Sequence, residues 1–272
     1  MSLANLALVG ASAVTSTTAR PLANAVEFIE APWGLNMQLF PVQRVIIKAH
    51  YGIPLDDDPA NAFEVTDFRR QNGRMMTEKQ YLEYLHDQGR SNIREVIPGV
   101  ERREMILSIG RRSGKTTISA CIAAYETYKL ISKGDPQAYY GLPAANMIQL
   151  ISVATDKDQA GLLYQEVSGH FRNCSFFGPY TANNTMSYAR FQTPKDVDRY
   201  GRYADDPSAK ATIKVTFRSC VAKGLRGAGN IVVILDEVAH FTDKGQSGAA
   251  AVYDAVVPST SAYTEKDPKD RH

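Results

Sequence analysis

A glycine-rich loop between an apolar run and a helical pattern constrains this chain more than any other stretch. Residues 105–109 are apolar and predict a buried strand, and the helical pattern begins at Thr117. At such a helix start, backbone N–H groups bind phosphate, a lysine reaches the β- and γ-phosphates, and a threonine hydroxyl binds Mg²⁺. Ile109 occupies the first-glycine position of the strict G-x-x-x-x-G-K-[ST] pattern, so the match is irregular. The residues expected to bind ATP here are Gly110, Arg112, Ser113, Gly114, Lys115, Thr116 and Thr117.

Two carboxylates follow a second apolar run, at residues 231–235. Five consecutive apolar residues precede Asp236 and Glu237, which predicts a fully buried parallel strand with both acids at its C-terminal edge. Ligands bind at that edge in open α/β sheets. We expect Thr116 and Asp236 to hold Mg²⁺ and Glu237 to polarise the water that attacks the γ-phosphate. The two motifs together predict an ATPase, although each alone also fits a glycine-rich turn or a strand that happens to end in acids.

An aromatic residue and a glutamine lie upstream of the loop. Pro41 suits a helix start, and Phe40 with Gln43 could form an adenine pocket, the ring stacking on the base and the amide binding its edge. The alternative is that Phe40, Val42 and Ile46 pack on the core and Gln43 is solvated.

The composition limits the class of protein. A length of 272 residues allows one large α/β domain or two small ones, and a net charge of +2 does not by itself indicate a nucleic-acid partner. The three cysteines have neither a disulfide nor a zinc spacing, which favours a reducing cytoplasm. The first nineteen residues are uncharged but lack a basic region, so we expect an arm or short packing helix rather than a signal peptide. None of the apolar runs reaches the ~18 residues that a membrane span needs.

The rest of the chain alternates helix and strand patterns, which predicts a parallel sheet. Residues 54–100 form an expected insertion, with an acidic solvated loop and a capped helix that begins at Thr77. Further elements are expected at 22–29 (helix), 147–154 (strand) and 155–170 (helix, with Thr155 or Asp156 as N-cap), and residues 256–260 as a helix end and loop.

Residues 188–226 are locally basic, with nine lysines and arginines against four aspartates and five interleaved aromatic residues. Two interpretations stay open. The stretch contacts a phosphate backbone, or it is a solvated β-hairpin insertion with residues 211–217 as one strand. Arg218, Lys223 and Arg226 are the candidates for DNA contact or for coupling to the nucleotide.

With these motifs in view, residues 33–260 resemble the ATPase domain of the large terminase subunit of tailed bacteriophages, the motor that drives DNA into capsids. The resemblance implies an α/β P-loop NTPase of the additional-strand (RecA/ASCE-like) type, with a mostly parallel central sheet flanked by helices. It implies an N-terminal arm at 1–32 and an ATPase domain at 33–272, which hydrolyses ATP to translocate double-stranded DNA into the procapsid in the host cell cytoplasm.

The resemblance also implies roles and partners. Gln43 would recognise adenine, Arg111 would act as a sensor or finger in cis, and Glu237, Arg111 and Lys115 would carry catalysis. Expected partners are double-stranded DNA, a portal protein, a small terminase subunit and copies of the chain in a ring, although the isolated chain could be a monomer. Candidates for an arginine or lysine supplied to a neighbouring copy are Lys157, Arg172 and Arg226.

Two departures and two alternatives accompany the resemblance. The family's coupling motif has only a weak counterpart at 256–260, and the residues after 260 are too few for the family's nuclease domain, so nuclease activity is not expected. A superfamily 2 helicase or restriction-type translocase shares the motifs, but His240 lies one position too late for an Asp-Glu-x-His box. A nucleotide-dependent binding module without hydrolysis is the other alternative, and it would not need Glu237.

Overall fold

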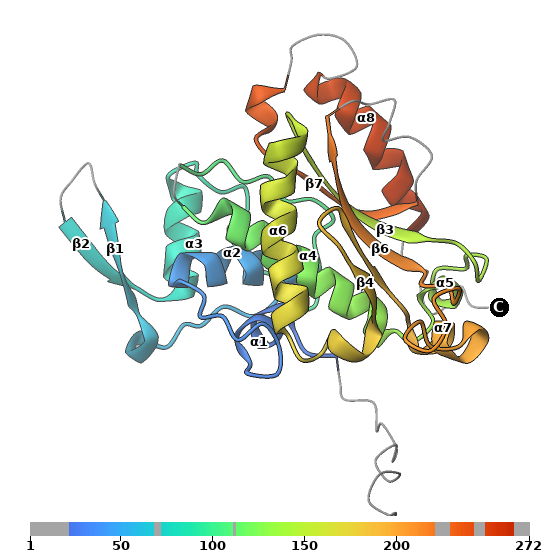
Figure 1. The fold of residues 1–272 in the computed structure, drawn as a ribbon. Coiled ribbons are helices and arrows are strands. Elements are labelled where there is room, and N and C mark those ends of the chain that lie inside the picture. Colours follow the sequence, from blue (N-terminus) through green and yellow to red (C-terminus); the bar gives the residue numbers. More distant parts are fainter. Residues whose placement is uncertain (1–21, 68–71, 111–112, 221–228, 242–247, 264–272) are drawn as a thin grey trace, which may run out of the picture.

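A mixed five-stranded sheet forms the centre of the molecule (Figure 1). The computed structural model describes residues 22–67, 72–110, 113–220, 229–241 and 248–263. The strand order is β4-β5-β6-β3-β7, in which β3 runs parallel to both β6 and β7 while β5 is antiparallel to β4 and β6. The strands are β3 (Ile148–Ala154), β4 (Thr181–Asn184), β5 (Tyr188–Phe191), β6 (Ile213–Ser219) and β7 (Asn230–Leu235).

Helices cover both faces of this sheet. Because successive side chains of a strand point to opposite faces, β3 separates two cores. Ile148 and Leu150 pack with α4 (Lys115–Ser132) and α6 (Lys157–Asn173) on one face. Ile151 and Val153 pack with α8 (Ala249–Thr260) on the other.

Two N-terminal helices pack against α4. They are α1 (Ala25–Glu30) and α2 (Pro41–Tyr51), and α2 begins at the predicted proline. Tyr51 of α2 donates a hydrogen bond to Oε1 of Glu126 of α4 at 2.8 Å. Phe28 of α1 is fully buried, and its ring stacks on that of Tyr128 with centroids 4.4 Å apart. These contacts join α1 to the helix that follows the glycine-rich loop.

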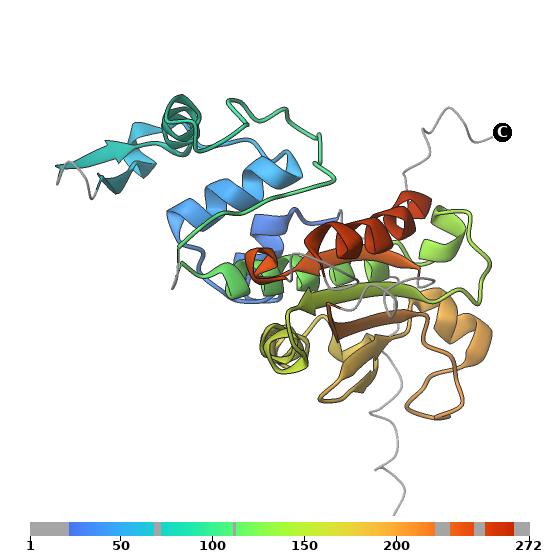
Figure 2. The ribbon, with the colours of Figure 1, turned by 90° about the horizontal axis from the view of Figure 1, so that it is seen from above.

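The stretch expected as an insertion forms a small sheet of its own. β1 (Phe63–Asp67) pairs antiparallel with β2 (Asn72–Met76), and α3 (Glu78–Asp87) follows with the predicted Thr77 cap. This unit shares a second core with Val45 and Ala49 of α2, and Figure 2 shows it on the far side of α2 from the large sheet. The domain boundaries themselves stay a prediction.

The expected strand at 105–109 is wrong. This segment has no regular secondary structure, and Ile106 is 85% exposed. In the part of the chain that the structure describes, β7 pairs with β3 alone, so β7 is an edge strand and residues 231–235 are partly exposed rather than fully buried. Apolar runs predict a strand but do not specify which neighbour it pairs with.

Of the two interpretations of residues 188–226, the solvated β-hairpin is wrong in its placement, because β5 and β6 pair antiparallel but both belong to the main sheet. Its predicted strand lies at 213–219 as β6, inside the main sheet between β5 and β3. Ile213 and Val215 of β6 join the core under α4 and α6, which places the strand in the sheet. In the sequence, the helix α7 (Pro194–Tyr200) lies between β5 and β6.

Other elements lie near their predicted places. β3 is confirmed, and α6 begins after Asp156, whose side chain accepts a hydrogen bond from Gln159 N and so decides the N-cap. Residues 256–260 belong to the last turns of α8 rather than to a loop. The short helices are η1 (Pro59–Asn61), α5 (Pro136–Tyr139), η2 (Gly178–Tyr180), η4 (Val238–His240) and η6 (Ser261–Tyr263).

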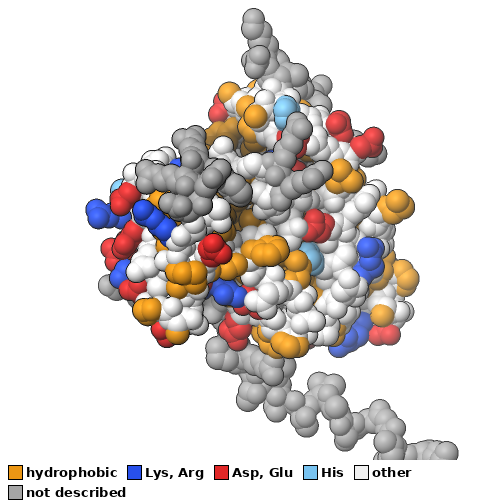
Figure 3. All heavy atoms as spheres, turned by 90° about the vertical axis from the view of Figure 1, so that its left-hand side faces the viewer, with side chains coloured by type: hydrophobic (Ala, Val, Ile, Leu, Met, Phe, Trp, Pro, Cys, Tyr) orange, Lys and Arg blue, Asp and Glu red, His pale blue; other side chains and the backbone are white. Residues whose placement is uncertain are grey.

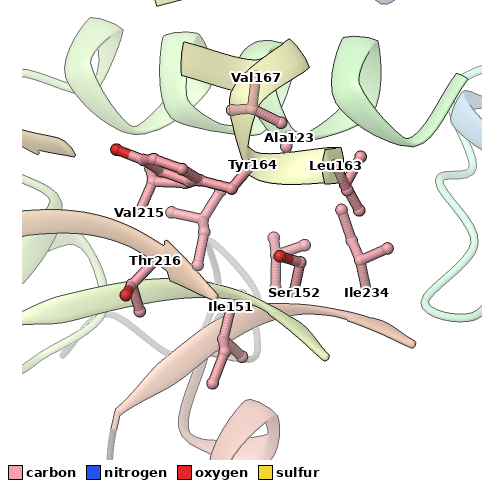
Figure 4. Close-up of a pocket in the computed structure, with 11 residues that line it drawn as sticks. Ala123, Ile151, Ser152, Leu163, Tyr164, Val167, Val215, Thr216 and Ile234 are labelled. Atoms are coloured by element: carbon pink, nitrogen blue, oxygen red, sulfur yellow. The ribbon is translucent and has the colours of Figure 1, made fainter. Parts of the chain in front are cut away.

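Between α4, α6 and the sheet lies a cavity of about 10 Å³ (Figure 4). Its walls are mostly apolar, with Leu163 and Val167 of α6 facing Val215 and Ile234 of the sheet. This volume is at the lower limit for a single water molecule. The cavity is therefore a packing gap in the core and not a ligand site.

Among the residues that the structure describes, no helix combines the length and the apolar character needed to cross a bilayer.

Candidate functional site

The residue before α4 is a glycine with a turn conformation. Gly114 adopts a left-handed conformation (φ +77°), which favours glycine, and a Cβ there would lie 2.6 Å from Nε2 of Gln43, so the glutamine amide would have to shift. α4 then begins at Lys115, which leaves the first N–H groups of an eighteen-residue helix without partners inside the helix. This helix start can bind an anion.

An open cleft of about 870 Å³ lies above this helix start. The volume falls within the range of small-molecule sites, roughly 300–1,000 Å³. Two segments far apart in sequence face each other across it, the loop with the first turn of α4 and the turn after β7. The lining residues are Ile109, Gly110, Ser113, Gly114, Lys115, Thr116, Thr117, Glu237, Ala239 and His240.

The two acids follow β7 as predicted. Asp236 N donates to Val153 O at 2.8 Å, which extends the ladder with β3 to the edge of the sheet. Burial and the carboxylate of Glu237 raise the pKa of Asp236, although a backbone hydrogen bond and Lys115 oppose the shift. Asp236 is therefore a carboxylate that a cation would stabilise.

Glu237 has an unusual backbone. Its φ of +52° is left-handed, which costs a non-glycine residue about 1–2 kcal/mol. This left-handed conformation changes the chain direction between β7 and η4. Glu237, Ala239 and His240 then line the cleft.

Sequence reasoning missed the residue that holds Glu237. Gln159, in the first turn of α6, donates a hydrogen bond from Nε2 to Oε2 of Glu237. The hydroxyl of Thr155 donates to Oε1 of Gln159 at 2.7 Å, which fixes the orientation of the amide. Thr155 and Glu237 follow the adjacent parallel strands β3 and β7. The polar residues after β3, at the same edge of the sheet as Glu237, were therefore the sequence signal that could have indicated Gln159.

A family model described as "Uncharacterized protein MJ0330, N-terminal P-loop domain" matches residues 77–268, well over half of the chain. The chain belongs to this family. The matched residues include every residue that lines the cleft. The domain is therefore a P-loop domain, which implies nucleotide binding. No curated protein and no solved structure matches the chain.

The residues of this P-loop domain fit the expected magnesium nucleotide. Thr116 lines the cleft beside Lys115, and Asp236 directly follows the facing strand β7. Within the described ranges, no three side chains of His, Cys, Asp or Glu gather in a metal-binding group. One or two protein ligands completed by phosphate oxygens and water is the arrangement that Mg²⁺ prefers.

The structure contradicts one of the two expectations for the upstream pair of this P-loop domain. Phe40 is 72% exposed and Val42 is exposed, whereas Gln43 is 8% exposed, so the alternative with a packed Phe40 and a solvated Gln43 is wrong. Oε1 of Gln43 accepts from Phe40 N at 3.0 Å, and its Nε2 faces Gly114. Neither Phe40 nor Gln43 lines the cleft, and their role toward adenine stays a prediction.

Several expected residues cannot be placed in this P-loop domain. Arg111, Arg112, Lys223 and Arg226 lie outside the described residues, as does the side chain of Lys157. Arg218 is exposed near the end of β6, and Arg172 is exposed on α6.

Proposed function

We propose that this P-loop domain is the ATPase motor of a viral large terminase, which hydrolyses ATP to move double-stranded DNA into a procapsid. The observation that carries the hydrolytic part is Glu237, which Gln159 holds at the cleft opposite Lys115 and Thr116. A site that only bound nucleotide would not need an oriented carboxylate there. The terminase part rests on the resemblance of the motifs.

The residues divide the work as follows. Lys115 and the N–H groups of α4 bind the phosphates. Thr116 and Asp236 would hold Mg²⁺, which would neutralise charge on the phosphate oxygens. Glu237 accepts a proton from water as the water oxygen bonds to the γ-phosphorus. The bond from that phosphorus to the β–γ bridging oxygen breaks, and ADP and phosphate are released.

The wider assignment includes a RecA/ASCE-like sheet, Arg111 as a cis finger, and the cytoplasm of the host as the location. Double-stranded DNA, a portal protein, a small terminase subunit and a ring of identical copies are the proposed partners. The irregular loop and the Asp236-Glu237 pair support this assignment over a general nucleotide-binding protein.

ATP binding and steady-state hydrolysis with Mg²⁺ test the catalytic part, in Lys115→Ala, Glu237→Gln and the parent. Lys115→Ala is expected to lose nucleotide binding. Glu237→Gln is expected to bind ATP while turnover falls about 10²- to 10⁴-fold, the usual contribution of a general base. Glu83→Gln, an exposed glutamate on α3, is the matched control and should behave like the parent. Equal, measurable turnover in Glu237→Gln and the parent would show that Glu237 is not the base. ATP binding by the parent without turnover would leave a binding module without hydrolysis as the better assignment.

A further inference from the structure

The strands β5 and β6 carry a group of basic residues on one face. The register pairs Tyr188 with Thr216 and Arg190 with Lys214, so these four side chains share a face, and Arg218 lies on it two residues beyond Thr216. The opposite face carries buried apolar residues of both strands, which pack in the core under α4 and α6. The basic side chains therefore point away from that core.

Within the described part of the chain, helices leave this basic face open. α6 packs extensively on β6, but it lies on the opposite face. α8 lies on the same side of the sheet, where its core cluster includes Ile151, Val153, Val233 and Leu235 of β3 and β7. Cys220, which follows β6, also belongs to this cluster, but no described residue of β6 itself does. Arg218 is exposed, and Tyr188, Arg190 and Lys214 are partly exposed.

The cations on this face lie close together without acids. Cζ of Arg190 lies 5.3 Å and Nζ of Lys214 5.5 Å from the centre of the Tyr188 ring. Among the described residues, neither these two nor Arg218 forms an ion pair. Burial, then Arg218 and Arg190, lower the pKa of Lys214, because its positive charge is not compensated. An anionic partner would supply that compensation.

We propose that the surface formed by Tyr188, Arg190, Lys214 and Arg218, here called the basic face, binds the phosphate backbone of double-stranded DNA. Two cations already lie over the Tyr188 ring, so the ring positions charges and is not open for stacking on an unpaired base. Lys214 and Arg218 are four residues apart on one strand, about 13 Å. This separation is close to the roughly 12 Å width of the DNA major groove, so the two can contact phosphates on both sides of it.

The basic face also lies near the nucleotide cleft. Arg218 and Leu235 both pair with Val153, so the three residues form one row across the sheet. β6 and β7 flank β3 and are therefore about 10 Å apart, and Leu235 directly precedes Asp236. The choice of DNA as the partner rests on the proposed function. DNA bound to the basic face would lie near the edge of the sheet that carries the catalytic acids.

The side of the molecule that carries the insertion provides a contrast. Figure 3 shows acidic and basic side chains interspersed there, with small apolar groups between them. Arg74, Arg90 and Arg94 are exposed in this part of the chain. Their replacement removes the same charge as replacement of the three cations of the basic face.

Binding of the full chain to a fluorescent DNA duplex, without nucleotide and at several salt concentrations, tests the proposal. Arg190→Gln/Lys214→Gln/Arg218→Gln is expected to weaken binding at least tenfold and to reduce the slope of log K against log [salt] by about 2–3, since each phosphate contact contributes about 0.9. Arg74→Gln/Arg90→Gln/Arg94→Gln should retain the parent slope. Circular dichroism checks the fold, and the exposed single variant Arg218→Gln, with an expected slope change of about 1, replaces the triple variant if that variant does not fold.

Three outcomes overturn the proposal: equal losses in both triple variants, no binding of duplex by the parent, and tighter binding of single-stranded DNA or RNA than of duplex. ATP hydrolysis without DNA is measured in parallel and is expected to be unchanged in the basic-face variant. If the parent binds duplex and hydrolyses ATP but the basic-face variant binds like the parent, the result counts against the basic face alone. Absence of hydrolysis in the parent counts against the proposed function, and absence of duplex binding in the parent counts against both.

Discussion

At the scale of single residues, Gln159 decides how Glu237 can act. Its amide donates to the carboxylate and is itself fixed by Thr155. We expect Gln159→Leu to lower kcat for ATP hydrolysis about 10- to 100-fold, the usual cost of losing a residue that orients a catalytic group. KM for ATP should change little, because the phosphate-binding residues lie on α4. Steady-state kinetics measure both quantities.

A matched variant separates positioning from packing. Gln165→Leu makes the same change at an exposed site on α6 and should leave kcat unchanged. Gln159→Glu places a second carboxylate beside Glu237, which raises the pKa of the pair and should move the pH–rate profile to higher pH. If Gln159→Leu hydrolyses ATP as fast as the parent, Gln159 does not position the base.

At the scale of elements, α1 depends on one side chain for its attachment to the P-loop helix. Phe28 is fully buried, and its ring contacts those of Trp33, Tyr125, Tyr128, Phe176 and Phe177. We expect Phe28→Ala to lower the free energy of unfolding by about 3–5 kcal/mol. Urea unfolding measures the loss.

The same truncation at an exposed ring is the control. Phe40 directly precedes α2, and its ring is exposed. Phe40→Ala should therefore change the free energy of unfolding by less than about 0.5 kcal/mol. A loss in Phe28→Ala no larger than in Phe40→Ala would contradict the role of the aromatic cluster.

The elements also show what the sequence could predict. Local capping chemistry located helix starts, since Thr77 and Asp156 each accept a backbone hydrogen bond three residues ahead. The partner of a strand is set by residues far away in the sequence. Local patterns therefore could not reveal that β6 lies inside the sheet or that residues 105–109 stay unpaired within the described region. The same distinction between local motifs and distant contacts holds for the site. Gly114 to Thr117 and the two acids belong to local motifs, whereas Gln159 meets Glu237 only because β3 and β7 are neighbours.

At the scale of the whole molecule, partly buried histidines make stability depend on pH. Burial lowers the pKa of His50; Lys129 and Arg102 lower it further, whereas Glu101 opposes the shift. Burial also lowers the pKa of His170, and Glu166 opposes that shift. As the pH falls through about 6.5, the unfolded chain binds protons at these sites before the folded chain does, so the free energy of unfolding falls. Each histidine contributes a slope below about 1.4 kcal/mol per pH unit, the limit for one proton.

The carboxyl groups give the opposite sign, which makes the histidine contribution separable. Burial raises the pKa of Glu126 and of Asp236, so the stability that these groups contribute decreases as the pH rises above about 4. His50→Gln/His170→Gln should therefore flatten the slope between pH 7 and the lowered histidine pKa values while it leaves the carboxyl effect in place. Urea unfolding at a series of pH values measures these slopes in the parent, the double variant and both single variants. An unchanged slope in the double variant would show that protonation of other groups controls the stability of the folded chain in this range.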